Sequence, residues 1–257
     1  MTVYLVGAGP GSPDLLTLRA ARLLAAADIV VHARLVDSRI LEMAPLTATV
    51  IDAGKYPGGP SDAQAHINTV LVDAARRAAV VIRLKGGDPY VFGRGGEEAV
   101  ALRSAGIEVE VVPGVSSAIA GPAAAGIPVT MRGLSSGFTV IAGHQDPAGT
   151  DPLDWEALAR LGTTLVVLMG ASQAAEIADR LLTAGMAPAT PVAAVESATS
   201  VEQRVLRSRL DELANLAEGT IRAPAVLVVG EVAGLDVADA EFGALVSEMA
   251  SETGGGR

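Results

Sequence analysis

The stretch of sequence that decides the fold is Val-Val-Ile-Arg-Leu-Lys-Gly-Gly-Asp-Pro-Tyr-Val-Phe-Gly-Arg-Gly-Gly-Glu-Glu, residues 80–98. The apolar run at its start, Val80 to Leu84, predicts a buried strand, and a helical pattern begins near Glu97. Between them, five glycines fall within residues 86–96. Glycine permits positive φ and close approach of a ligand to bare backbone, but ordering it is entropically costly. The stretch therefore fits either a tight-turned connection or a small-molecule cradle at the carboxyl end of a strand, where open α/β sheets bind ligands.

The composition of the whole chain predicts a cytoplasmic α/β enzyme. Half of the 257 residues are apolar, and no apolar run approaches the ~18 residues that span a bilayer. The first residues lack the basic and apolar regions of a secretion signal. The net charge of −10 argues against bulk nucleic-acid binding. Cysteine is absent and the histidines, His32, His66 and His144, are scattered, so we expect neither disulfides nor a metal site.

The order of the predicted elements indicates two α/β domains, because strands that alternate with helices form parallel βαβ units. We expect an N-terminal domain at residues 1–112, a hinge at Val112-Pro113-Gly114, a C-terminal domain at 115–236 and a frayed acidic tail at 237–257. Strands are predicted at 3–6, 28–32, 50–52, 80–84, 109–112, 138–141, 164–168, 192–195, 203–206 and 225–229. Helices are predicted at 15–26, 62–78, 97–105, 117–125, 155–160, 171–184 and 210–216.

The first glycine loop, Gly7 to Ser12, does not fit a dinucleotide-binding fingerprint. Ser12 stands where that fingerprint needs its third glycine, and Pro10 removes an amide that a pyrophosphate would use. No acidic residue ends the second strand, where a ribose partner would stand, and the P-loop pattern is absent as well. A glycine-rich loop of this kind suits a ligand without phosphates, such as S-adenosylmethionine.

Nine segments together carry a resemblance to a known family. They are Val6–Gly11, Leu15–Leu18, Gly54–Lys55, Arg83–Glu98, Val111–Ala118, Ala125–Thr130, Ala142–His144, Met169–Gly170 and Pro224–Val232. In this order they resemble the uroporphyrinogen-III C-methyltransferases, within the wider tetrapyrrole methylases. The similarity runs from Val3 to about Val232.

The resemblance implies two α/β domains with mostly parallel sheets, an active-site cleft between them, and a homodimer. It implies S-adenosylmethionine as cofactor and C-methylation of uroporphyrinogen III to precorrin-2, in the corrinoid or sirohaem pathway. By motif position, the cofactor contacts would be Pro10, Gly86, Gly87, Asp88, Val91, Ser116, Ser117, Met169 and Ala198. Taken without the resemblance, some of these residues have ordinary structural explanations. Met169 could fill the core, Ser116 and Ser117 could cap a helix, and Asp88 could sit in a turn.

The chemistry implied by the resemblance needs cations on the substrate side. A sulfonium methyl is already activated, so positioning and exclusion of water supply most of the catalysis. A tetrapyrrole acceptor carries many carboxylates, which arginine binds in bidentate fashion. Arg34, Lys55 and Arg132 lie at strand ends or in substrate-side motifs and are the expected catalytic residues. Taken alone, each is more often a solvated surface charge.

The chain departs from the family pattern on the substrate side. The family's Tyr-Asp-Arg-Leu-Val is His32-Ala33-Arg34-Leu35-Val36, so the aspartate proposed as proton acceptor is Ala33. Met131 replaces a histidine, Leu168 replaces a tyrosine, and the segment after Lys55 lacks the family's basic, histidine-bearing stretch. A methyltransferase of the same family with a different small acceptor is therefore an alternative, as is a non-catalytic relative. The acidic charge disfavours RNA methylation.

Overall fold

The computed structural model describes residues 1–54, 63–143, 153–217 and 220–235. Its contacts divide the chain into two compact units, Met1–Ser116 and Ser117–Arg257, and each is described by itself. Lys55 and the expected acidic tail lie outside the described residues. No helix within the described ranges is long and apolar enough to cross a membrane.

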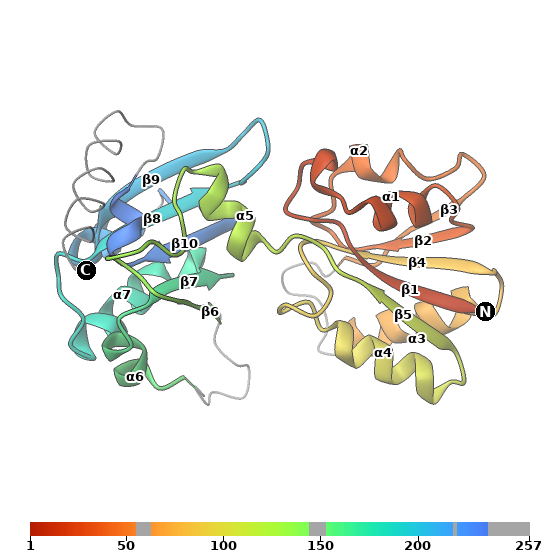
Figure 1. Ribbon diagram of the computed structural model, residues 1–257. Coiled ribbons are helices and arrows are strands. Elements are labelled where there is room, and N and C mark those ends of the chain that lie inside the picture. Colours follow the sequence, from red (N-terminus) through yellow and green to blue (C-terminus); the bar gives the residue numbers. More distant parts are fainter. Residues whose placement is uncertain (55–62, 144–152, 218–219, 236–257) are drawn as a thin grey trace, which may run out of the picture. The chain divides into compact units, whose positions relative to one another are not determined.

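The N-terminal unit is a parallel sheet with helices on both faces (Figure 1). Its strands run in the order β3-β2-β4-β1-β5, and every described pair is parallel, as the alternating pattern predicts. The strands are β1 (Thr2–Gly7), β2 (Ile29–His32), β3 (Thr49–Asp52), β4 (Val80–Lys85) and β5 (Glu108–Val112). The helices are α1 (Leu18–Leu24), α2 (Ser38–Leu41), α3 (Ala63–Ala75) and α4 (Gly95–Ser104), with a 3₁₀ turn, η1, at Pro13–Leu15.

Burial on both faces explains why the inner strands β1, β2 and β4 are mostly apolar. Helices α3 and α4 pack Leu71 and Leu102 against one face of the sheet, whereas α1 and α2 pack Leu24 and Ile40 against the other. A parallel sheet covered on both sides selects such sequences. Because all five strands point the same way, the loops that follow them gather at one edge of the sheet, and this edge includes the glycine-rich segments.

The C-terminal unit is built around a mixed sheet in the order β6-β7-β10-β8-β9. Its strands are β6 (Phe138–Ala142), β7 (Thr164–Leu168), β8 (Pro191–Glu196), β9 (Arg204–Arg209) and β10 (Ala225–Val229). The helices are α5 (Ser117–Ala124), α6 (Trp155–Arg160), α7 (Ala174–Thr183) and α8 (Leu213–Ala217), with 3₁₀ turns η2 (Ala171–Gln173), η3 (Leu210–Glu212) and η4 (Glu231–Gly234). Helices α6, α7 and α8 cover one face, while α5 and η4 cover the other.

The expectation of a mostly parallel sheet is wrong for this second unit. Among the described strands, β6 and β7 are parallel, but β7–β10, β10–β8 and β8–β9 are antiparallel. Strands β8 and β9 are joined directly by residues 197–203, and a parallel pair would need a longer crossover. No helix is predicted between 192–195 and 203–206, so the antiparallel pairing could have been read from the sequence.

Local sequence accounts for the start of two helices in the N-terminal unit. The Thr17 hydroxyl accepts a hydrogen bond of 3.1 Å from the Ala20 amide, so Thr17 caps α1. The short helix α2 is absent from the predicted elements, and Asp37 caps it through a 2.9 Å hydrogen bond from the Arg39 amide. The predicted helix at 171–184 begins instead as the 3₁₀ turn η2 and continues as α7.

A buried cluster of three charged side chains joins β4 to α4. Glu98 has no exposed surface, and its carboxylate oxygens lie 3.1 Å from Arg83 Nε and 2.7 Å from Lys85 Nζ. The Arg83 guanidinium also donates to the Val31 carbonyl oxygen at 3.4 Å. The cluster brackets the glycine-rich segment, because Lys85 precedes that segment and Glu98 follows it.

Glu98→Ala should lower the free energy of unfolding by about 3–5 kcal/mol, because it leaves two buried cations without their carboxylate. The matched control is Glu97→Ala on the same helix. Glu97 pairs with Arg94 at the surface, and such pairs contribute about 1 kcal/mol or less. Urea unfolding of both variants measures the difference. Equal losses would show that the buried cluster contributes no more than a surface ion pair.

Candidate active site

The loops after β1 and β4 are joined through their backbones at the carboxyl edge of the N-terminal sheet. The Gly87 amide donates to the Gly9 carbonyl at 2.7 Å, and the Gly9 amide donates to the Gly87 carbonyl at 3.2 Å. The Ala8 amide donates to the Lys85 carbonyl at 2.7 Å. Pro10 follows directly, so the structure brings Pro10, Gly86 and Gly87 together.

The loop after β5 reaches the same place by close backbone contact. A Cβ on Gly7 would stand 2.5 Å from Gly114 Cα, and a Cβ on Gly114 would overlap the Gly87 carbonyl oxygen. Three loops therefore meet where only glycine fits. Gly87 also has φ +65°, in the region that glycine adopts without steric cost.

Asp88 fixes this junction with its side chain. Its Oδ1 accepts from the Tyr90 amide at 2.8 Å, as in a turn, and its Oδ2 accepts from the Gly114 amide at 3.1 Å. The turn explanation is thus correct but incomplete, since the carboxylate also ties the glycine-rich loop to the segment that leads to Ser116. Asp88 holds the cradle in shape.

The glycine-rich loop leaves space and apolar surface open. A Cβ on Gly86 would meet only the Leu35 side chain within 4.0 Å. Tyr90, Val91 and Phe92 are exposed in the described structure, although they are large apolar residues. Phe92 has φ 50°. Positive φ is costly for residues other than glycine and concentrates at ligand sites.

Two of the predicted cofactor residues lie at one edge of the C-terminal sheet. Strands β7 and β8 both run antiparallel to β10, so Met169 after β7 and Ala198 after β8 emerge at the same edge. Ser117 begins α5, which packs against β10 and β7. These three residues belong to the C-terminal unit, whereas the six from Pro10 to Ser116 belong to the N-terminal unit.

The alternative that Met169 fills the core is wrong. Its residue surface is 46% exposed and its φ is 58°. Ala198 is flanked by two further residues with positive φ, Ser197 at 43° and Thr199 at 68°. Among the described residues other than glycine, positive φ occurs only at 92, 94, 169, 197 and 199. All five positions fall in the segments that carry predicted cofactor residues. The positive φ angles of Ser197 and Thr199 could not be predicted from the sequence.

The expected substrate-side cations lie in both units. Arg34 is exposed at the carboxyl end of β2, and a Cβ on Gly54 would lie 2.7 Å from its Cβ. Arg132 is exposed in the turn that the Met131 amide closes on the Ser135 carbonyl at 3.0 Å. Lys55 is outside the described residues. The roles of all three residues stay predictions.

The nearest carboxylate after Ala33 is engaged elsewhere. Asp37 caps α2 and lies 2.8 Å from the Arg39 guanidinium, and the hydrogen bonds from the Arg39 side chain and amide lower the pKa of Asp37. Ala33 itself is held by its amide, which donates to the Leu84 carbonyl at 2.9 Å. The Asp37 carboxylate therefore has both oxygens bonded to Arg39.

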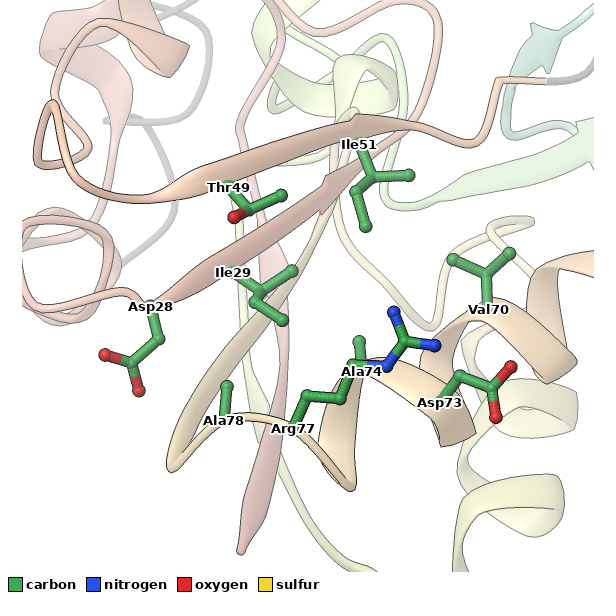
Figure 2. Close-up of a pocket in the computed structure, with 9 residues that line it drawn as sticks. All are labelled: Asp28, Ile29, Thr49, Ile51, Val70, Asp73, Ala74, Arg77 and Ala78. Carbon is green, nitrogen blue, oxygen red and sulfur yellow. The ribbon is translucent and has the colours of Figure 1, made fainter.

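A separate hollow lies away from the glycine loops. It has a volume of ≈ 520 Å³ and opens at the amino ends of β2 and β3, beside α3 (Figure 2). Asp28 at its rim is already used, because its carboxylate accepts from the amides of Ala79 and Val80 at 3.1 and 2.9 Å. Ligands of open α/β sheets bind at the opposite, carboxyl edge. The hollow is therefore no part of the candidate site.

Comparison with known proteins identifies the family. The model of the tetrapyrrole (corrin/porphyrin) methylases matches residues 2–214, and the chain belongs to this family. It is 52% identical over 232 residues to an S-adenosyl-L-methionine-dependent uroporphyrinogen III methyltransferase of Methanosarcina barkeri, a match that covers 90% of this chain and 91% of the relative. It is 50% identical over 232 residues to a uroporphyrinogen-III C-methyltransferase of Pseudomonas aeruginosa. That match covers 90% of this chain and 93% of the relative.

A solved structure shares the fold. The crystal structure of uroporphyrin-III C-methyl transferase from Thermus thermophilus, complexed with S-adenyl homocysteine, superposes with a TM-score of 0.79. It is 44% identical to this chain and covers 91% of it and 94% of the other chain.

Proposed function

We propose that this chain is an S-adenosylmethionine-dependent methyltransferase that C-methylates uroporphyrinogen III to precorrin-2. The observation that carries the proposal is the junction of three glycine loops at the carboxyl edge of the N-terminal sheet, in a chain about half identical to relatives of that name. The product of the cofactor is S-adenosylhomocysteine. We further propose a cytoplasmic homodimer, which rests on the family resemblance.

The junction suits S-adenosylmethionine. It offers bare backbone, open space beside Gly86 and the exposed apolar side chain of Val91, and Pro10 provides no amide for a phosphate. When bound, the cofactor supplies a sulfonium methyl group that needs no further activation. The residues proposed to hold it are Pro10, Gly86, Gly87, Asp88, Val91 and Ser116, together with Ser117, Met169 and Ala198. Their work is to orient the methyl group and to exclude water.

Binding and methylation of the tetrapyrrole need cations that hold its carboxylates and a group that removes one proton. Arg34, Lys55 and Arg132 are proposed to hold the substrate's carboxylates, since guanidinium groups bind them in bidentate fashion. A ring carbon that accepts a methyl group becomes positively charged and must then lose a proton. Ala33 offers no carboxylate and Asp37 is engaged with Arg39, so the proton is proposed to leave to water or to another base.

The packing of Leu168 and Met131 weakens the alternative that the chain methylates a different small acceptor. Leu168 is 8% exposed and belongs to the core cluster of the C-terminal unit, and Met131 packs against that same cluster. Replacing a tyrosine and a histidine at these positions is thus explained as core packing. Ala33 and the segment after Lys55, which lies outside the described residues, remain the departures that bear on the acceptor.

The proposed function is tested by incubating the purified chain with uroporphyrinogen III and S-adenosylmethionine, beside other tetrapyrrole and nitrogen-heterocycle acceptors. We expect methylated tetrapyrrole by mass spectrometry, and one saturable S-adenosylhomocysteine site per chain by calorimetry. Activity only on another acceptor would refute the proposed substrate while leaving the cofactor site in place. A folded chain that binds no S-adenosylhomocysteine would refute the methyltransferase proposal altogether.

Gly87→Val should abolish S-adenosylhomocysteine binding, because a β-branched residue strongly disfavours φ +65° and its methyl groups would occupy the cradle. Gly96→Ala is the matched control, since a Cβ at Gly96 would meet no described residue outside its own helix within 4 Å. Calorimetry measures the affinity, and circular dichroism checks that both variants are folded. Unchanged affinity in Gly87→Val would mean that the glycine-rich loop is only a turn.

Arg34→Ala, Lys55→Ala and Arg132→Ala should each lower kcat/KM for uroporphyrinogen III by about 10–100-fold, the loss expected for a charge-assisted hydrogen bond. Their affinity for S-adenosylhomocysteine should stay that of the parent. Arg76→Ala, at an exposed arginine in the turn directly after α3, is the control and should change neither quantity. Comparable damage to cofactor affinity would show that these cations serve the cofactor instead of the acceptor.

A further inference from the structure

We propose that Gln203 is a positioning residue that holds the loop after β8 in the backbone shape needed for cofactor binding. The inference rests on the proposed function, because the loop at residues 197–200 carries Ala198, a proposed cofactor contact. Gln203 is not among the expected site residues, and the inference gives it no contact with the cofactor itself. Its effect would pass through the loop.

The loop has a shape that its own residues do not favour. Ser197 and Thr199 adopt φ 43° and 68°, on either side of Ala198. Positive φ is uncommon for any residue with a Cβ and is a clear outlier for a β-branched one such as Thr199. Such a conformation persists only where neighbouring groups over-determine it. Contacts outside the three residues must therefore hold them.

Gln203 supplies such contacts with both ends of its amide. Its Oε1 accepts from the Thr199 amide at 2.8 Å, at the strained residue itself. Its Nε2 donates to the Ala124 carbonyl at 2.9 Å. Ala124 is the last residue of α5, and a carbonyl at a helix C-terminus has no partner within the helix. Gln203 thus ties the loop that carries Ala198 to the helix that begins at Ser117.

The two bonds need an amide side chain. One end must accept from an N–H group and the other must donate to a carbonyl, and among side chains of this length only glutamine does both. A glutamate would keep the bond to Thr199 but would set a carboxylate oxygen against the Ala124 carbonyl. A methionine of similar length would keep the volume and lose both bonds.

The base of the loop is fixed independently of Gln203. Glu196 at the end of β8 is buried, and its carboxylate oxygens lie 2.9 Å from Arg204 Nε and 3.0 Å from Arg204 Nη2 on β9. The Arg222 amide also donates to Glu196, at 2.7 Å. A change at Gln203 should therefore disturb the tip of the loop while leaving β8 and β9 paired.

The experiment compares Gln203→Met with the parent and with Glu202→Gln, an exposed neighbour on the same loop. We expect the dissociation constant for S-adenosylhomocysteine to rise about tenfold in Gln203→Met, together with KM for S-adenosylmethionine, while kcat at saturating cofactor changes little. Glu202→Gln should match the parent. A lower melting temperature with unchanged affinity would make Gln203 a merely structural residue and overturn the proposal.

Gln203→Glu keeps the proposal testable if the methionine variant does not fold. Because it keeps the bond from the Thr199 amide but sets a carboxylate oxygen against the Ala124 carbonyl, its affinity for S-adenosylhomocysteine should fall by at least about threefold. Parent-like affinity in a folded Gln203→Glu would overturn the positioning role while leaving the cofactor site intact. A parent chain that binds no S-adenosylhomocysteine would instead remove the site, and this inference with it.

Discussion

The close contact of Gly7, Gly87 and Gly114 is the constraint on which the rest of the N-terminal unit depends. Three loops from three different strands meet there with no room for a Cβ on Gly7 or Gly114. The parallel order of β4, β1 and β5 brings the loops to one edge, and the helices that cover both faces fix those strands. The cradle is therefore a property of the whole sheet, although its atoms come from a few glycines.

Both units use a side chain that accepts a backbone amide to hold a proposed ligand loop. In the N-terminal unit, the Asp88 carboxylate accepts hydrogen bonds from the backbone amides of Tyr90 and Gly114. In the C-terminal unit, the side-chain oxygen of Gln203 accepts a hydrogen bond from the Thr199 backbone amide, and its side-chain nitrogen donates to the Ala124 carbonyl. Each loop contains residues with positive φ, which glycine alone adopts freely. Pre-organised backbone of this kind reduces the ordering cost of binding.

Most of the fold could be predicted from the sequence, because apolar periodicity and glycine punctuation mark strands and helices locally. Helix α2 could not be predicted, because four residues carry little periodic signal. The mixed second sheet was missed because strand direction depends on connections, and the helix-free link between β8 and β9 was overlooked. For the site, the glycine positions followed from motif, whereas the strain at Thr199 and the part of Gln203 depend on contacts made only in three dimensions.

The buried cluster of Arg83, Lys85 and Glu98 has a consequence for how this sequence can evolve. Removing Glu98 leaves two buried cations without their carboxylate, and removing either cation takes a buried ion-pair partner from Glu98, so single replacements should be purged even where a wholly apolar trio of similar volume would be tolerated. The three positions should therefore drift only together, through rare coupled changes. Arg83 and Lys85 would then stay the same among relatives because their replacement destabilises the fold. Their conservation would therefore not by itself indicate a role in methyl transfer.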